Sequence, residues 1–277
     1  MTRRILAGAG VFAAAAVAFA FLLLPIVAIF ARVSPRTLVA QLSHPVVTDA
    51  LVLSLKTSAI AQALVLLLGT PAAYLLATRR FPGRSVAVVL VELPLVLPPA
   101  VAGIGLIATF GRLGLLGGTL DALGVRLGLT QAAVVIAVAY VASPLYVRQA
   151  IAAFEAVDVD LVAASRTLGA GGTRTFFRVV LPLARIGLIA GLALSFARGL
   201  GEFGATIMFA GSLQQVTQTL PLAIYAEFDV NFDAALAMSA VLVVVSVLLL
   251  AGLRIVLSWQ SSSSTTSRFR FGPSISG

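Results

Sequence analysis

Long apolar stretches recur along the chain, separated by short segments that hold most of its polar and charged residues. A helix that crosses a membrane needs about 20 mostly apolar residues, and six stretches meet this length. Their approximate bounds are 5–31, 50–77, 86–110, 131–150, 185–210 and 234–257. They lack the alternation of apolar and polar positions that the strands of a membrane β-barrel require. The pattern therefore predicts an all-α membrane protein with six transmembrane helices.

The composition agrees with this pattern and divides the chain into three parts. Apolar residues make up 60% of the 277 positions and charged residues only 10%, whereas soluble domains are about 25% charged. The first apolar run exceeds the roughly 7–15 residues of a signal peptide, so we read residues 1–34 as an uncleaved first transmembrane helix. Residues 35–258 form a core domain with five further helices. The Ser- and Thr-rich segment 259–277 has too few apolar residues to fold, and we expect a disordered tail.

The positive charges lie mostly on one side of the predicted helices. Thirteen arginines fall on one side and five basic residues at or near the other. The first group is Arg3, Arg4, Arg79, Arg80, Arg84, Arg148, Arg166, Arg174, Arg178, Arg185, Arg254, Arg268 and Arg270; the second is Arg32, Arg36, Lys56, Arg112 and Arg126. Because cytoplasmic loops are enriched in Lys and Arg, we expect a multi-pass protein of the cell membrane with both termini in the cytoplasm. The net charge of +9 thus reports topology, and we expect no nucleic-acid partner.

Residues that carry chemistry are scarce. The chain has no cysteine and a single histidine, His44, which we read as a loop residue, so no metal site is predicted. A phosphate-binding loop of the form GxxxxGK[ST] needs a lysine after glycine, but the only lysine, Lys56, follows Leu55. We therefore expect no catalysis and no cofactor on this chain. If ATP drives its activity, another polypeptide must bind the nucleotide.

The longest segment on the cytoplasmic side, residues 154–185, predicts a short helix. Asp158 can cap its start, Asp160 suits the positive end of its dipole, and Gly169 can end it with a positive φ. Its apolar and basic positions are Leu161, Val162, Leu168 and Arg166. Such a helix is either a docking element for a partner protein or an amphipathic connector on the bilayer surface. The pattern alone does not separate these two interpretations.

Two charges stand inside the fifth apolar stretch. Arg198 and Glu202 lie roughly 20 Å along a helix that begins near Arg185, and each charge at this depth costs about 2.5–3.5 kcal/mol. Their spacing lets them pair, and we also expect partners on other helices. Gly201 lies between them and leaves the backbone approachable. The residues form either a buried ion pair that fixes helix register or the lining of a gate for an anion.

Three prolines interrupt the third apolar stretch. Pro94, Pro98 and Pro99 remove backbone donors and break the helix. Irregular backbone at membrane depth is tolerated only where protein or a cavity covers it. The segment is therefore either part of a transport path or gate, or a static kink that helps packing.

The segment after the fourth stretch resembles the cytoplasmic EAA loop of ABC-importer permeases. In that family Glu-Ala-Ala is followed after three residues by Gly, and after nine more by an Ile-x-Leu-Pro sequence. The residues that match are Ala164, Gly169, Val179, Leu181 and Pro182. The position of the family's glutamate is occupied by Ala163. The resemblance implies the MetI-like permease fold and a coupling helix that inserts into the ATPase subunit.

Four further stretches are similar to the molybdate permeases within the oxyanion branch of this family. They are LPLVLPPAVAGIGL at 93–106, TFGRLGLLGG at 109–118, FARGLGEFGATIMFAG at 196–211 and TQTLPLAIY at 217–225. The resemblance spans residues 35 to 250 and implies a homodimer, two ABC ATPase subunits that bind ATP-Mg, and an extracytoplasmic oxyanion-binding protein. Permeases for sulfate, thiosulfate or tungstate are the alternatives within the family. From other classes, an ATP-independent secondary transporter or channel and a membrane enzyme or assembly protein are the rivals.

Overall fold

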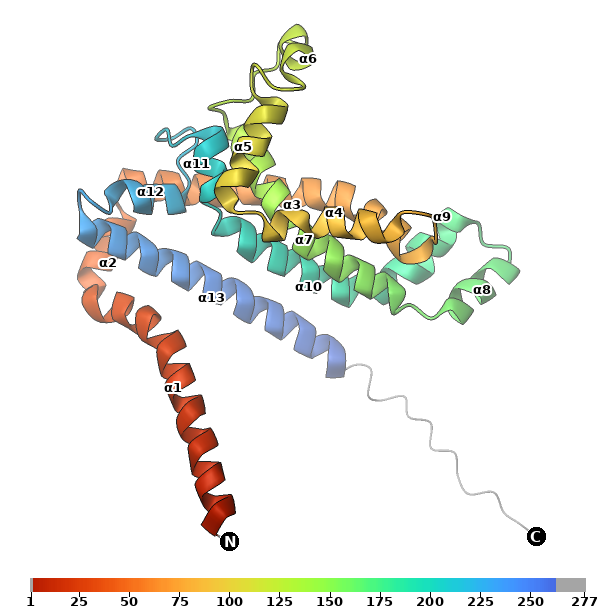
Figure 1. Ribbon diagram of the computed structural model, residues 1–277, viewed down its shortest axis with the longest axis horizontal. Coiled ribbons are helices and arrows are strands. Elements are labelled where there is room, and N and C mark those ends of the chain that lie inside the picture. Colours follow the sequence, from red (N-terminus) through yellow and green to blue (C-terminus); the bar gives the residue numbers. More distant parts are fainter. Residues whose placement is uncertain (1, 263–277) are drawn as a thin grey trace.

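The computed structural model describes the backbone of residues 2–262 and the side chains of residues 11–252. Every regular element in the described part of the chain is helical (Figure 1). The elements are α1 (Thr2–Arg32), α2 (Pro35–Leu42), α3 (Pro45–Thr78), α4 (Arg84–Val96), α5 (Pro99–Phe110), α6 (Gly117–Ala122), α7 (Gln131–Glu155), α8 (Val159–Thr167), α9 (Gly172–Thr175), the π-helical turn η1 (Phe176–Val180), α10 (Leu181–Leu200), α11 (Gly204–Ala210), α12 (Leu220–Glu227) and α13 (Phe232–Ser262). The predicted all-α class is confirmed.

Five helical stretches within the described residues are long and apolar enough to cross a membrane. They are Val11–Arg32, Pro45–Thr78, Gln131–Glu155, Gly172–Leu200 and Phe232–Gly252. The third predicted span, 86–110, is a pair of helices, α4 and α5, joined at an angle of 115°. The predicted fifth span, 185–210, also differs, because α10 ends at Leu200 and α11 begins after a break. Helix α13 continues to Ser262, past the boundary at residue 259 from which the tail was predicted; residues 263–277 lie outside the described residues.

Helix α7 forms the centre of the bundle and packs against both α3 and α10. Its buried residues are mostly alanine and valine, and the alanines, among them Ala133, Ala137 and Ala142, let neighbouring backbones approach closely. A side chain at Gly187 of α10 would place its Cβ 2.5 Å from the Cβ of Ala153. Figure 1 shows α3, α7 and α10 side by side along the long axis of the molecule, with α13 next to them.

Helix α1 extends away from this bundle (Figure 1). None of the residues in its most apolar window is buried within the chain, and Phe12, Phe19 and Phe21 are each more than 60% exposed. Such a surface is unstable in water. It must therefore be covered by lipid or by another protein.

The two ends of the bundle carry different elements. Helices α8 and α9 lie at one end, next to the last residues of α3 and α7, and α2 and α12 lie at the other (Figure 1). A buried contact fixes α12 there, because the Leu220 amide donates a hydrogen bond to Ser54 Oγ of α3 at 2.7 Å. These four short helices therefore lie where the long helices end.

Candidate functional site

The predicted short helix in the segment 154–185 is confirmed as α8. The Asp158 carboxylate accepts a hydrogen bond from the Asp160 amide at 2.9 Å, which caps the first turn. Gly169 ends the helix with a φ of +82°, a conformation that glycine adopts without strain. Leu161 is 48% exposed and Leu168 is 89% exposed. Both leucines therefore present apolar surface that the described residues leave uncovered.

The remaining residues of the EAA-like pattern lie on α8 and at the start of α10. Ala163, Ala164 and Arg166 are exposed on α8, while Leu181 and Pro182 form the first turn of α10. Between them the chain makes the π-helical turn η1, which the sequence reading missed. Pro182 has no amide hydrogen to donate to the carbonyl four residues earlier, which favours a wider turn at this place. Helix α8 is therefore connected to α10 through a short loop, α9 and this π-helical turn.

Arg198 and Glu202 form an ion pair at the end of α10. Arg198 Nη1 lies 2.8 Å from Glu202 Oε2, and the Glu202 side chain is only 1% exposed. The second carboxylate oxygen, Oε1, accepts the Ala205 amide at 2.8 Å, so Glu202 also caps α11. The expected partners on other helices are not seen among the described side chains, because the pair and this cap satisfy the carboxylate. The Arg198 side chain remains 33% exposed, so it is not enclosed as Glu202 is.

The three prolines lie at the bend between α4 and α5. Pro94 is in the last turn of α4, Pro98 stands immediately before α5 and Pro99 is its first residue. Pro98 and Pro99 are exposed in the single chain, so the bend opens onto the surface of the protein. The predicted break is thus confirmed, and the structure adds that it redirects the chain by 115°.

The two broken spans meet at their breaks. A side chain at Gly204, the first residue of α11, would place its Cβ 2.5 Å from the Cβ of Pro99. Further along, a Cβ at Gly103 would lie 2.6 Å from the Cβ of Met208 and 3.0 Å from the carbonyl oxygen of Ala205. Helices α5 and α11 therefore pack as a pair. This pair brings the predicted gate residues of the third and fifth stretches into one region.

A buried polar row on α3 belongs to the same part of the bundle and was not predicted. Ser54, Ser58 and Gln62 are each at most 5% exposed, and both polar atoms of the Gln62 amide lack a hydrogen-bond partner among the described residues. A Cβ at Gly199 would lie 3.7 Å from Gln62 Nε2, which places this amide next to the residue that follows Arg198. The spacing of four residues within an apolar run was the signal that could have revealed the row.

Comparisons with known proteins place this architecture in a family. Residues 66–261 match the family model described as the binding-protein-dependent transport system inner membrane component. The chain belongs to this family. The matched region runs from the middle of α3 to the end of α13, and therefore contains α8 and both broken spans.

Individual relatives and solved structures agree with this assignment. The permease is 45% identical over 234 residues to the molybdenum transport system permease protein ModB of Mycobacterium tuberculosis, covering 84% of this chain and 88% of that one. It is 44% identical over 178 residues to the Escherichia coli protein of the same name, covering 64% and 78%. A bacterial ABC transporter that imports alginate shares the fold with a TM-score of 0.73 and 14% identity, over 93% of this chain and 96% of that one. The MetNI methionine ABC transporter gives a TM-score of 0.59 with 19% identity, over 77% and 95%.

Proposed function

We propose that this permease is the transmembrane subunit of an ATP-driven importer and that it carries molybdate across the cell membrane. The observation that supports this most strongly is the 45% identity to ModB over 84% of the chain, together with the family match. The exposed leucines of α8 give such a subunit an apolar surface on which an ATPase subunit can dock. The chain itself is not an enzyme and holds no cofactor in this proposal, since ATP-Mg is bound by the partner.

The proposed assembly contains two copies of this chain, two ATPase subunits and an extracytoplasmic oxyanion-binding protein. Both termini and α8 face the cytoplasm in this arrangement, in agreement with the excess of arginines on that side. Each ATPase subunit receives one α8 in a groove. The second copy lies against the exposed surface of the bend at Pro98 and Pro99. A path for the anion then runs between the two copies.

Within this path, we infer that the two broken spans form the gate. Arg198 faces the path with the exposed part of its side chain, and Gly201 keeps the backbone next to it open. Because of the bend at Pro94, Pro98 and Pro99, the axis of α5, which packs against α11, is not aligned with the axis of α4. Closure of the ATPases would move α8, and through α10 it would move the α5–α11 pair, as rigid elements do in alternating access.

Transport in proteoliposomes tests this proposal. The permease is reconstituted with a molybdate-importer ATPase and a molybdate-binding protein from the same organism, and uptake of labelled molybdate is measured with and without ATP. We expect uptake only with ATP, and competition by tungstate but not by sulfate. Uptake of sulfate or thiosulfate without uptake of molybdate would assign the chain to the other oxyanion branch. Uptake that continues without the ATPase would identify a secondary transporter or channel.

Replacing Leu168 with Asp tests the docking role of α8. Leu168 is 89% exposed, so the substitution leaves folding intact but puts a charge into an apolar contact. We expect the ATPase to be retained at least about tenfold more weakly, the effect of losing about 1.4 kcal/mol, in a pull-down from detergent.

The matched control for Leu168 is Leu113→Asp. Leu113 lies between α5 and α6 and is fully exposed, yet it is far from α8 (Figure 1). We expect this variant to retain the ATPase as the unmodified chain does. If both variants retain the ATPase equally, α8 is a connector on the bilayer surface and not a docking element.

A further inference from the structure

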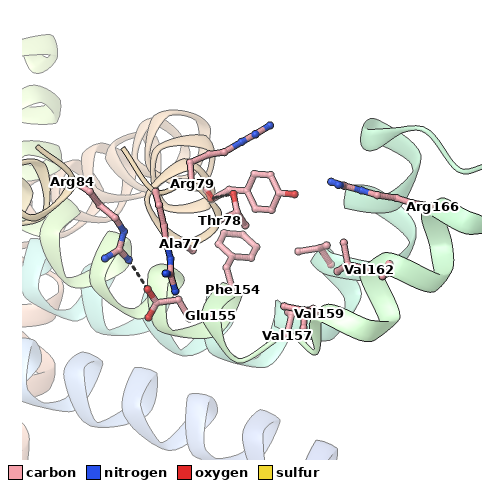
Figure 2. A pocket seen from close by; sticks show the side chains of 14 residues that line it. Ala77, Thr78, Arg79, Arg84, Phe154, Glu155, Val157, Val159, Val162 and Arg166 are labelled. Atoms are coloured by element: carbon pink, nitrogen blue, oxygen red, sulfur yellow. Dashed lines mark hydrogen bonds and ion pairs between the residues drawn. The ribbon is translucent and has the colours of Figure 1, made fainter. Parts of the chain in front are cut away.

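A cavity of about 890 Å³ opens where the ends of α3 and α7 meet α4 and α8 (Figure 2). Thr78, the last residue of α3, and Glu155, the last residue of α7, both line it. The cavity therefore lies at the level where the transmembrane helices end. This is the depth at which lipid headgroups surround a membrane protein.

The lining of this cavity is strongly basic. Arg79, Arg80, Arg84 and Arg166 line it, together with the single carboxylate of Glu155. Arg84 Nη2 lies 2.6 Å from Glu155 Oε1, whereas the other three arginines have no carboxylate within 4.0 Å among the described side chains. Figure 2 shows Arg79 and Arg166 entering the space from opposite sides, one from the end of α3 and the other from α8. The cavity is thus lined by three arginines whose charge no described carboxylate neutralises.

The wall below and between Arg79 and Arg166 is apolar. Phe154, Val157, Val159 and Val162 line it, and Figure 2 shows these side chains below and between the two arginines. A free inorganic oxyanion would satisfy the arginines but would leave this wall exposed. A ligand that carries a phosphate group next to a hydrocarbon chain can contact the arginines through the phosphate and the apolar wall through the chain.

We propose that this cavity binds the headgroup of an anionic phospholipid. The phosphate is held between Arg79 and Arg166 by charge-assisted hydrogen bonds, and the glycerol and upper acyl carbons lie on the valines. Basic pockets between transmembrane helices on the cytoplasmic side are suited to such headgroups. The assignment to the cytoplasmic leaflet rests on the orientation given under the proposed function.

The site does not compete with the partner that α8 receives. Leu161, Ala164 and Leu168 face a separate depression, which Arg174 and Arg178 also line, and none of them lines the lipid cavity. Helix α8 therefore has one face for the ATPase and another for the lipid. Because Arg166 belongs to α8 and Arg79 ends α3, a bound phosphate holds α8 against the bundle.

Counting bound lipids on the purified chain tests this proposal. The full chain in detergent is titrated with phosphatidylglycerol and, separately, with phosphatidylcholine of the same acyl chains, and native mass spectrometry measures each affinity. We expect phosphatidylglycerol to bind more tightly. The double variant Arg79→Gln/Arg166→Gln should bind it about 25-fold more weakly, fivefold for each charge lost near the surface. Both side chains are exposed and unpaired, so folding is retained.

The matched control is the double variant Arg174→Gln/Arg178→Gln, which removes the same charge from the neighbouring depression. We expect its affinity for phosphatidylglycerol to change less than twofold. The proposal is overturned if the control weakens binding as much, if the two lipids bind equally, or if millimolar inorganic phosphate or molybdate displaces the lipid. The measurement involves no transport, so its failure would leave the proposed importer function standing.

Discussion

Replacing Arg198 with Leu is expected to destabilise the chain by about 3–5 kcal/mol, the usual result of removing one partner from a buried ion pair. The Glu202 carboxylate would remain 1% exposed with only the Ala205 amide as a partner. Thermal unfolding in detergent, followed by the loss of monodisperse protein in gel filtration, measures this effect. The control is Arg126→Leu. Arg126 pairs with Asp121 at 3.4 Å with both side chains at least half exposed, so its loss should cost less than about 1 kcal/mol.

A second variant separates the two interpretations of this ion pair. Arg198→Leu combined with Glu202→Gln removes both charges and keeps an oxygen that can accept the Ala205 amide. We expect this double variant to recover most of the lost stability while molybdate uptake stays low, because the path has lost its guanidinium. Full recovery of uptake together with stability would show that the pair is purely structural. Equal stability of Arg198→Leu and Arg126→Leu would contradict the buried pair itself.

Replacing Gly103 with Val is expected to separate α5 from α11. The new Cβ would lie 2.6 Å from the Cβ of Met208 and 3.0 Å from the backbone oxygen of Ala205, and backbone cannot rotate away as a side chain can. Overpacking of this kind costs about 1–3 kcal/mol. The unfolding temperature and ATP-dependent uptake should both fall.

Gly105 on the same helix provides the control for Gly103. A Cβ at Gly105 meets no atom within 4 Å in the chain, and Gly→Val changes intrinsic helix propensity equally at both positions. We expect Gly105→Val to unfold at or above the temperature of the unmodified chain. Similar losses in the two variants would mean that the contact between α5 and α11 does not hold the gate region together.

Local signals made much of the fold predictable. An apolar run of about 20 residues identifies a span without knowledge of its neighbours, and the cap at Asp158 with the stop at Gly169 identifies α8. The contact between Arg198 and Glu202 followed from their spacing of four residues. Each of these features depends on residues that are close to one another along the sequence.

Features that depend on distant contacts were not predictable from the sequence. The stretch 196–211 is uniformly apolar around its two charges, yet the chain breaks after Leu200, where Gly204 packs against Pro99 from a different span. The angle of 115° at the prolines is likewise set by packing. The placement of Arg79 and Arg166 around one cavity depends on how α8 folds back on the bundle. The pattern of apolar and polar residues does not specify which residues of distant segments contact one another.

The π-helical turn η1 also sets the direction in which α8 faces. A π-helical turn contains an additional residue compared with an α-helical turn, and one residue corresponds to about 100° of rotation around a helix axis. Deleting one residue between 176 and 180 would let α9 and α10 join as a regular α-helix. Leu161 and Leu168 would then be rotated by about a quarter of a turn around the axis of α10. The residues exposed on α8 would stay the same, but they would face another direction.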